Sequence, residues 1–165
     1  MTFHIERAHV RDLTKVKPLW KAMIHHYATI TDGLWAVREP TEAWQRRHQE
    51  YLNWINDATG VIFLAVQDEE VIGYAALHLI ESGATFDFGE KFGDIETLAV
   101  APEHRDRGVG SALVAACREE LERREIAYWT MISLASNEGA VRLAERSGFK
   151  PFMVRMVQRL DLSKD

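Results

Sequence analysis

The chain has 165 residues, 47% of them hydrophobic and 27% charged, which suits one domain with a packed core and leaves too little for two. The formal net charge is −5 with no lysine-rich tail, which argues against nucleic acid as the main partner because such binding depends on neutralising phosphates. No apolar run approaches the length of a bilayer span, and the N-terminus lacks the apolar core of a signal peptide. The one cysteine, Cys117, excludes an internal disulfide framework and favours a reducing, cytoplasmic location. The seven histidines show no metal-ligand spacing, so we expect no metal.

The N-terminal third predicts a short strand over residues 3–5 and then two helices. Asp12 is expected to cap the first helix, whose apolar side chains follow helical spacing from residue 13 to residue 27. Pro18 lacks the N–H that a helix interior requires, so the regular helix either begins near it or kinks there. Thr41 is expected to cap the second helix, after a connection over residues 29–40.

A hairpin of two buried strands is predicted next. Residues 61–66 are all apolar, residues 67–70 form the turn, and residues 71–80 return as the second strand. The segment 82–93 then carries three phenylalanines among glycines and acidic residues, and it is either a flexible turn or an aromatic lid; they are Phe86, Phe88 and Phe92.

The stretch from residue 94 to residue 121 predicts a strand, a basic glycine turn and a helix. Proline cannot donate to a strand ladder, so Pro102 ends the strand. Ile95 and Leu98 are three apart and would fall on opposite faces of a regular strand. A bulge between them would restore one apolar face with Val100, and it would leave backbone groups near Leu98 free for a ligand.

Gly108 and Gly110 open the helix of this stretch. Unpaired N–H groups at a helix start carry partial positive charge, and Arg105 and Arg107 add full charge, so the turn predicts a phosphate or pyrophosphate cradle. A P-loop would need a lysine directly after its second glycine, where position 111 is Ser. A dinucleotide fingerprint would need a third glycine at position 113, which is Leu.

After the helix, residues 126–134 predict another strand. Ser136 or Asn137 caps a short helix that closes at Gly148, and residues 152–160 predict a final strand with partial alternation. This order predicts a mixed sheet with one crossover helix between two parallel strands.

Two blocks of this sequence together resemble the GNAT superfamily of N-acetyltransferases. The acyl-CoA-binding signature matches Leu98-Ala99-Val100-Ala101-Pro102 through Arg105-Asp106-Arg107-Gly108-Val109-Gly110, and the second block matches Asn137-Glu138-Gly139-Ala140 with Leu143 and Gly148-Phe149. The resemblance implies an α+β (mixed α/β) fold: a single GNAT-like domain over residues 1–165 with a central mixed, largely antiparallel, splayed β-sheet flanked by helices. It implies acetyl-CoA as the acyl donor, an amine of a small molecule or peptide as the acceptor, and a homodimer as one possible assembly.

The resemblance also implies roles for individual residues. The pantetheine arm would pair with the bulged strand as a pseudo-strand, and the turn would hold the pyrophosphate. Asn137 either binds the pantetheine amides or only caps its helix. The cofactor-binding residues carried over are Leu98, Ala99, Val100, Arg105, Asp106, Arg107, Gly108, Val109, Gly110, Ser111, Asn137 and Ala140.

Acetyl transfer to an amine requires a base, because an ammonium group of pKa about 10.4 has no free lone pair. Glu96, on the signature strand, is the favoured base, directly or through water, and Asp94 is the second candidate; a solvated strand carboxylate is the plain alternative for Glu96. The backbone N–H of Leu98 is the expected oxyanion donor. Many family members carry a tyrosine after the leucine of the second block to protonate the thiolate, but Ala144 stands there.

Tyr128 or Ser133, or water, could then supply that proton. In the resembled family the first two helices and their connection wall the acceptor pocket. Asp32 and Trp35, in the connection, are better pocket candidates than the helical Trp44 and Tyr51, which are expected to pack. Ala144 also keeps open an alternative function, a catalytically weak acyl-CoA-binding regulatory or sensor module, and a nucleotide-binding domain is a third possibility.

Overall fold

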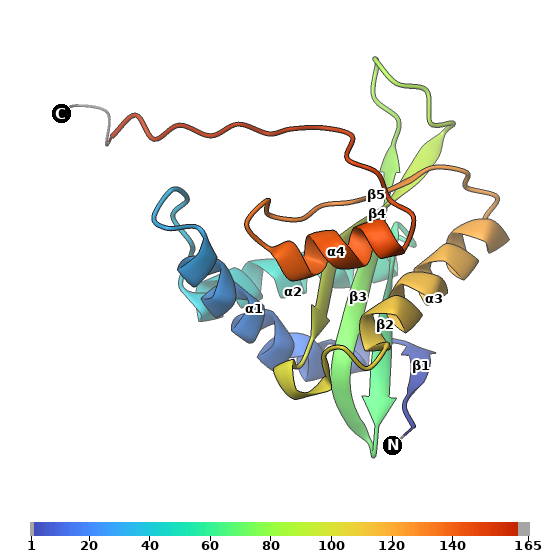
Figure 1. Ribbon diagram of the computed structural model, residues 1–165. Coiled ribbons are helices and arrows are strands. Elements are labelled where there is room, and N and C mark those ends of the chain that lie inside the picture. The colour runs from blue at the N-terminus through green and yellow to red at the C-terminus, as the bar shows by residue number, and fades with distance from the viewer. Residues whose placement is uncertain (1, 162–165) are drawn as a thin grey trace.

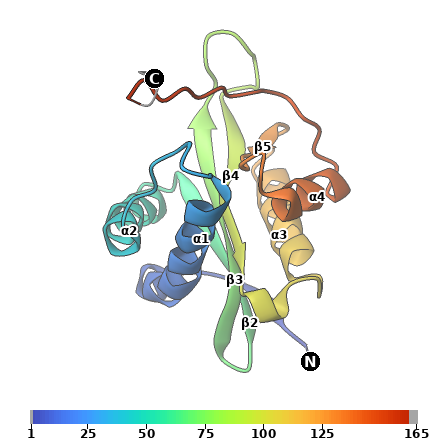
Figure 2. The same cartoon turned by 60° about the vertical axis from the view of Figure 1, so that its left-hand side comes forward.

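A computed structural model describes residues 2–161 and shows one five-stranded sheet with helices on both faces (Figure 1). Turning the view shows α1 and α2 on one face and α3 and α4 on the other (Figure 2). The elements in chain order are β1 (His4–Arg7), the 3-10 helix η1 (Val10–Val16), α1 (Lys17–Ile30), α2 (Pro40–Asn56), β2 (Gly60–Gln67), β3 (Glu70–Glu81), β4 (Lys91–Val100), the 3-10 helix η2 (Pro102–His104), α3 (Val109–Arg123), β5 (Trp129–Met131) and α4 (Glu138–Arg146).

The sheet order is β1-β2-β3-β4-β5, with antiparallel pairing from β1 to β4 and a parallel pairing of β4 with β5. The parallel pair is joined through α3, because parallel neighbours need a crossover connection. The mixed, largely antiparallel sheet with one crossover helix is therefore confirmed.

The bulge in β4 is confirmed. Ala76 pairs with Thr97 and the next residue, Leu77, pairs with Ile95, so Glu96 is the extra residue on the bulged strand. The consequence is the one expected: Ile95, Leu98 and Val100 all contribute to the apolar cluster that packs under α3.

The splay of the sheet begins directly after the bulge. The β4–β5 ladder holds only three pairs, from Gly93 with Trp129 to Ile95 with Met131. The strand expected over residues 126–134 is accordingly shorter, because the two strands diverge beyond Met131. Among the described residues, the β5-facing edge of β4 from Glu96 to Val100 has no ladder partner. An open slot of backbone groups therefore follows the bulge.

Two apolar clusters fill the space between the layers. One lies on the side of α1 and α2 and includes the fully buried Tyr51 and Tyr74, whose hydroxyl oxygens are 3.3 Å apart. The other lies under α3 and includes Leu113 and Cys117, both fully buried. Cys117 is therefore a packing residue of α3.

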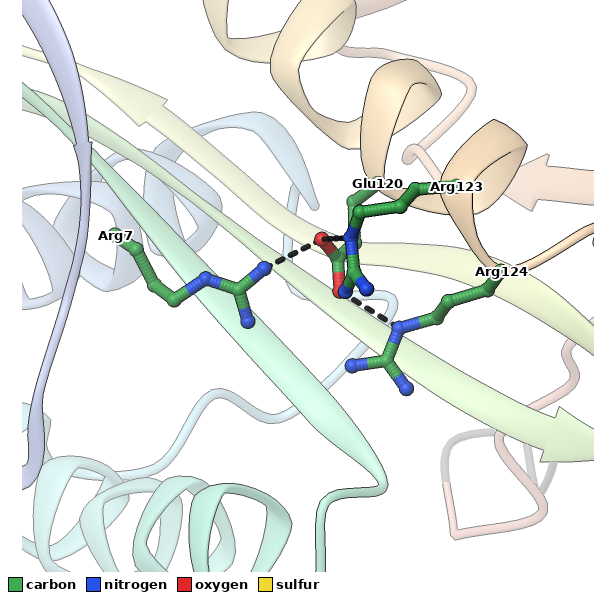
Figure 3. A network of polar contacts seen from close by, with 4 residues as sticks. All are labelled: Arg7, Glu120, Arg123 and Arg124. Atoms are coloured by element: carbon green, nitrogen blue, oxygen red, sulfur yellow. Dashed lines mark hydrogen bonds and ion pairs between the residues drawn. The ribbon is translucent and has the colours of Figure 1, made fainter.

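A buried carboxylate fixes α3 to the far edge of the sheet (Figure 3). Glu120 is 5% exposed and pairs with Arg7 of β1, with Arg123 at 2.8 Å and with Arg124 at 2.6 Å. Burial opposes the charged form, but the hydrogen bonds from the arginines win, so the pKa of Glu120 lies below its usual range. The network ties β1 and α3 together at the edge of the sheet opposite β5.

The expected caps of the first two helices are corrected. Asp12 is the third residue of η1 rather than its cap, and its carboxylate accepts the backbone N–H of His9 at 3.0 Å. The regular helix α1 starts at Lys17, so Pro18 falls in its first turn, where no N–H is required. Glu39 caps α2 in place of Thr41, because its side chain accepts the N–H of Glu42 at 2.9 Å.

The predicted final strand over residues 152–160 is absent: this segment is extended but joins no β-ladder. Phe152, the first residue of the segment, packs instead on the connection between β3 and β4, where its ring centroid lies 5.2 Å from that of Phe86. In the same place the ring centroid of Phe88 lies 5.2 Å from those of Phe92 and Tyr128. The β3–β4 connection thus carries an aromatic cluster.

Candidate active site

The basic turn precedes α3 and has the backbone geometry of a helix-start cradle. Gly108 is the N-cap residue with φ +83°, in the left-handed region that favours glycine. Arg105, Asp106 and Arg107 are all exposed, and the Nε of Arg105 donates to the carbonyl of Val100 at 3.2 Å. That bond folds the turn back against the end of β4, so the cationic turn lies next to the open strand edge.

Gly110 joins three elements of the site. A Cβ built there would lie 3.0 Å from Cδ2 of Leu143 in α4 and 3.7 Å from Cδ2 of Leu98 in β4. The missing side chain therefore lets α4 and β4 approach the start of α3, a packing role that was not foreseen. Of its two neighbours in the chain, Ser111 is exposed, whereas Val109 is 2% exposed, so Val109 can offer a ligand only its backbone.

Glu96, the bulge residue, faces α2. Its Oε1 lies 2.6 Å from Nη2 of Arg47, and its other oxygen accepts the hydroxyl of Thr97. The side chains of Arg47 and Glu96 are 19% and 25% exposed. Burial raises the pKa of Glu96, and Arg47 and Thr97 oppose that effect without cancelling it. Glu96 is thus a shielded carboxylate with more affinity for a proton than an ordinary glutamate, which suits a general base.

Asp94, the second candidate base, is placed differently. It is 4% exposed, and its Oδ1 accepts the hydroxyl of Thr130 in β5 at 2.6 Å. Burial raises the pKa of Asp94, and the Thr130 bond opposes it. This bond lies within the three paired residues of β4 and β5, before the two strands diverge. Asp94 therefore helps to hold the two strands together there.

Arg47 was missed at the level of sequence. Its guanidinium carbon lies 5.1, 5.6 and 5.7 Å from the ring centroids of Trp20, Tyr51 and Trp54, within the range of cation–π contacts. Nη1 pairs with Glu50 at 2.9 Å, and the buried Nε has no hydrogen-bond partner in the described chain. An arginine on the apolar side of α2, between Trp44 and Tyr51, was the signal that could have revealed it.

Tyr27 of α1 also lies toward Glu96. Burial raises the pKa of Tyr27, and the charge of Glu96 adds to that effect. Asp32 and Trp35, the expected pocket residues, lie on the α1–α2 connection, where Trp35 is 42% exposed. Trp44 and Tyr51 are buried, as expected for packing residues. Arg47 of α2 and Tyr27 of α1 therefore lie toward Glu96.

The second sequence block forms α4. Asn137 is its N-cap, and the side-chain oxygen of Asn137 accepts the N–H of Ala140 at 3.4 Å. Asn137 therefore caps the helix. The cap uses its side-chain oxygen and the N–H of Ala140, and the side-chain nitrogen of Asn137 takes no part in it.

The two alternative proton donors lie at different places along β5. Tyr128 precedes the first β4–β5 pair and packs on Phe88, at the closed end of the splay. Ser133 follows the last pair, where the strands diverge, and its hydroxyl contacts the carbonyl of Leu134 at 3.2 Å. Ser133 is accordingly the better placed of the two.

Residues 2–161 contain neither a membrane-spanning helix nor a metal-binding cluster. No helix in this range combines the length and apolar character of a membrane span. No cluster of three or more His, Cys, Asp or Glu side chains that could hold a metal ion occurs in the same range.

The site consists of three features that follow one another along the chain: the bulge in β4, the open edge of β4 after it, and the basic start of α3. Such a site can hold a thioester with a diphosphate tail. The family model of the acetyltransferase (GNAT) family matches residues 27–149. The chain therefore belongs to the acetyltransferase (GNAT) family.

Among characterised proteins, a mycothiol acetyltransferase of Geodermatophilus obscurus is 35% identical over 95 residues, which is 57% of this chain and 30% of that protein. The chain thus matches less than a third of that relative's length.

Solved structures share the fold over nearly the whole chain. A predicted acetyltransferase of Clostridium acetobutylicum, solved with acetyl-CoA, gives a TM-score of 0.78 at 15% identity over 96% of this chain and 97% of that one. A GCN5-related N-acetyltransferase of Ralstonia eutropha JMP134 gives 0.76 at 21% identity over 97% and 99%. AAC(6')-Iy, bound to a bisubstrate analogue of CoA and acetylneamine, gives 0.74 at 18% identity over 96% and 98%.

Proposed function

We propose that residues 1–165 form a single acetyltransferase domain that moves the acetyl group of acetyl-CoA onto a primary amine of a small molecule or peptide by direct attack, in a cytoplasmic setting. The observation that carries the proposal is the bulge at Glu96. It sets a shielded carboxylate directly beside the stretch of β4 that has no ladder partner on its β5 side. A base and a strand-like slot for the donor thus meet at one point.

The donor would lie along this slot. Pantetheine amides can pair with the open backbone from Leu98 to Val100, in the manner of an added strand. The diphosphate would then reach the turn, where Arg105 and Arg107 and the amides from Gly108 to Ser111 supply charge and donors. The side-chain amide nitrogen of Asn137 is the donor that α4 can add.

The chemical step needs few groups. Glu96 takes a proton from the ammonium, directly or through water, and the freed nitrogen lone pair forms a bond to the thioester carbonyl carbon. The backbone N–H of Leu98 donates to the oxyanion of the tetrahedral intermediate. The C–S bond then breaks, the nitrogen loses its second proton as the amide forms, and the CoA thiolate takes up that proton, relayed through water or through the hydroxyl of Ser133.

A cationic amine is the acceptor class that the carboxylate of Glu96 can bind and deprotonate. The neighbouring groups, Glu50 and the rings of Trp20, Tyr51 and Trp54, hold the guanidinium of Arg47. AAC(6')-Iy, with its neamine-derived analogue, supports a polyamine as one acceptor to test, beside small metabolite amines and peptide termini or lysines.

The second candidate function is an acyl-CoA-binding regulatory or sensor module. Ala144 favours it, because α4 offers no proton donor at the place where many relatives have a tyrosine. The two functions differ in one observable: only the enzyme releases CoA in response to an amine.

The test measures CoA release from acetyl-CoA with a panel of amines, together with acetyl-CoA binding by calorimetry. Glu96→Gln should lower the rate at neutral pH and recover partly at high pH, where free amine is abundant. Glu50→Gln is the matched control, since it also removes a carboxylate from Arg47 but leaves the bulge intact. Binding without amine-dependent release would support the sensor. A larger thermal shift with NAD or ATP than with acetyl-CoA would contradict both.

A further inference from the structure

A chain of buried hydroxyl groups ends at the carboxylate of Glu96. The hydroxyl oxygens of Tyr74 on β3 and Tyr51 on α2 are 3.3 Å apart. Tyr51 is hydrogen-bonded in turn to Thr97 on β4, and the hydroxyl of Thr97 donates to Oε2 of Glu96. Both tyrosines are fully buried, and Thr97 is 3% exposed. Because buried hydroxyl groups need partners, these three are satisfied by one another and by the carboxylate.

The chain of hydroxyl groups has a direction. An ionised carboxylate only accepts hydrogen bonds, so the hydroxyl hydrogen of Thr97 points to Glu96. The oxygen of Thr97 is then the acceptor for Tyr51, and the oxygen of Tyr51 is the acceptor for Tyr74. Burial raises the pKa of both tyrosines, so both keep their hydrogens in any enzyme assay. Every hydroxyl hydrogen of the chain therefore has an acceptor while Glu96 is ionised.

The far end of the chain opposes the reverse direction. A proton on Oε2 of Glu96 that pointed to Thr97 would turn every hydroxyl of the chain around. Tyr51 is the one hydrogen-bond partner of the Tyr74 hydroxyl within residues 2–161, so the reversed chain would leave the Tyr74 hydrogen without an acceptor in the core. A buried donor without an acceptor is costly, and a hydroxyl bonds a charged oxygen more strongly than a neutral one. The chain thus favours the ionised form of Glu96.

The two oxygens of Glu96 are held from two sides. Nη2 of Arg47 lies 2.6 Å from Oε1, and the hydroxyl of Thr97 holds Oε2. Thr97 is fixed by its pairing with Ala76 in the β3–β4 ladder, whereas Glu96 is the extra residue of the bulge and has no ladder partner on β3. A glutamate side chain has several rotatable bonds, so contacts to both oxygens fix the plane of its carboxylate. Each oxygen retains a further acceptor position for the amine proton.

Other ionisable groups face Glu96 from the elements packed around it. Besides the two tyrosines of the hydroxyl chain, they are Tyr27 of α1, Arg47 and Glu50 of α2, and Asp94 of β4. Burial and the two neighbouring carboxylates raise the pKa of Glu96, whereas Arg47 and Thr97 lower it. Thr97 is therefore the uncharged group that acts in the same direction as the arginine.

We propose that Thr97, supported by Tyr51 and Tyr74, is a positioning residue for Glu96: its hydroxyl fixes one carboxylate oxygen while Arg47 fixes the other, so that the base stands ionised in one orientation. Because it needs Glu96 to be the base, this inference rests on the proposed function. Thr97 acts through Glu96 and touches neither acetyl-CoA nor the amine in this role.

The test measures kcat/KM for CoA release against pH with the best amine of the panel. Thr97→Val keeps the branched shape and removes the hydroxyl. The acid limb should move to higher pH by about one unit, which is about a tenfold loss on that limb, with a small change on the plateau. Thr97→Ser retains a hydroxyl and should restore the limb. Tyr51→Phe keeps the ring beside Arg47 and should give a smaller shift in the same direction.

Two further variants make the test specific. Thr130→Val is the matched control, because Thr130 donates a buried hydroxyl to Asp94 at 2.6 Å in the same sheet, and it should leave the limb in place. In a Glu96→Gln background, Thr97→Val should add no further change to the pH profile, since the group through which it acts is gone. Circular dichroism and acetyl-CoA binding by calorimetry show that each variant is folded.

The outcomes separate this inference from the proposed function. If Glu96→Gln has the pH profile of the wild type, Glu96 is not the base and both are overturned. If Glu96→Gln alters the profile but Thr97→Val and Tyr51→Phe leave the acid limb in place, only the role of Thr97 is overturned. The same holds if Thr97→Ser does not restore the limb, or if Thr130→Val moves it as far as Thr97→Val does.

Discussion

Replacing Arg47 by glutamine should change the pH dependence of the enzyme more than its maximal rate. Arg47 lies 2.6 Å from Glu96, and both side chains are mostly buried, at 19% and 25% exposure. The positive charge favours the ionised form of Glu96 against burial, which raises its pKa. In Arg47→Gln the arginine no longer lowers the pKa of Glu96 against the effect of burial, so the carboxyl stays protonated to higher pH. The acid limb of kcat/KM should therefore move to higher pH.

The size of the effect follows from the contact. A hydrogen bond to a charged group contributes about 1.5–3 kcal/mol, and each 1.4 kcal/mol is a factor of ten. On the acid limb kcat/KM should fall by about 10- to 100-fold. On the plateau, where Glu96 is ionised in both proteins, the loss should be small.

The assay follows CoA release with saturating acetyl-CoA and the best amine of the panel, from about two pH units below to two above the acid limb. Arg46→Gln is the matched control, because it removes the same charge from the preceding residue of α2, whose partner is Glu42 rather than Glu96. Arg47→Lys retains the charge without the planar contacts to the rings and should restore part of the limb. An unmoved limb in Arg47→Gln, in a protein whose activity still depends on Glu96, would refute this reasoning.

Three further predictions concern packing and charge. Gly110→Asp should weaken acetyl-CoA binding more than Gly110→Ala, since both crowd Leu143 but only aspartate repels the diphosphate; equal dissociation constants in calorimetry would contradict this placement of the cradle. Glu120→Gln should lower the free energy of unfolding by about 2 kcal/mol at pH 7. The pKa of Glu120 is lower in the folded protein than in the unfolded chain, so the stabilisation by its carboxylate is fully present above the unfolded pKa of about 4.3. This stabilisation is lost as the pH falls through the folded-state pKa. Urea unfolding of the wild type and Glu120→Gln at pH 7 and pH 3 would show whether their difference in unfolding free energy shrinks at low pH. Burial raises the pKa of Cys117 to about 12, so the native protein should not react with a thiol reagent at pH 8, and rapid labelling would show that α3 opens.

The sequence by itself determined the features that depend on neighbours in the chain. The odd spacing of Ile95 and Leu98 was enough to predict a bulge, because a strand has a strict period of two. Gly108 with the adjacent arginines predicted a helix start suited to an anion, since that conformation and charge are local. The GNAT resemblance rested on the same local blocks.

Only the tertiary structure decided what depends on contacts between distant segments. The partner of Glu96 is Arg47, about fifty residues earlier in the chain, and no local pattern links an arginine on α2 to a bulge on β4. Gly110 proved to be a packing glycine because Leu143 of α4 approaches it. The strand pattern of residues 152–160 was visible in the sequence, but whether it joins the sheet depends on where the folded molecule holds it, and the contacts of Phe152 and Arg159 hold it outside the ladder.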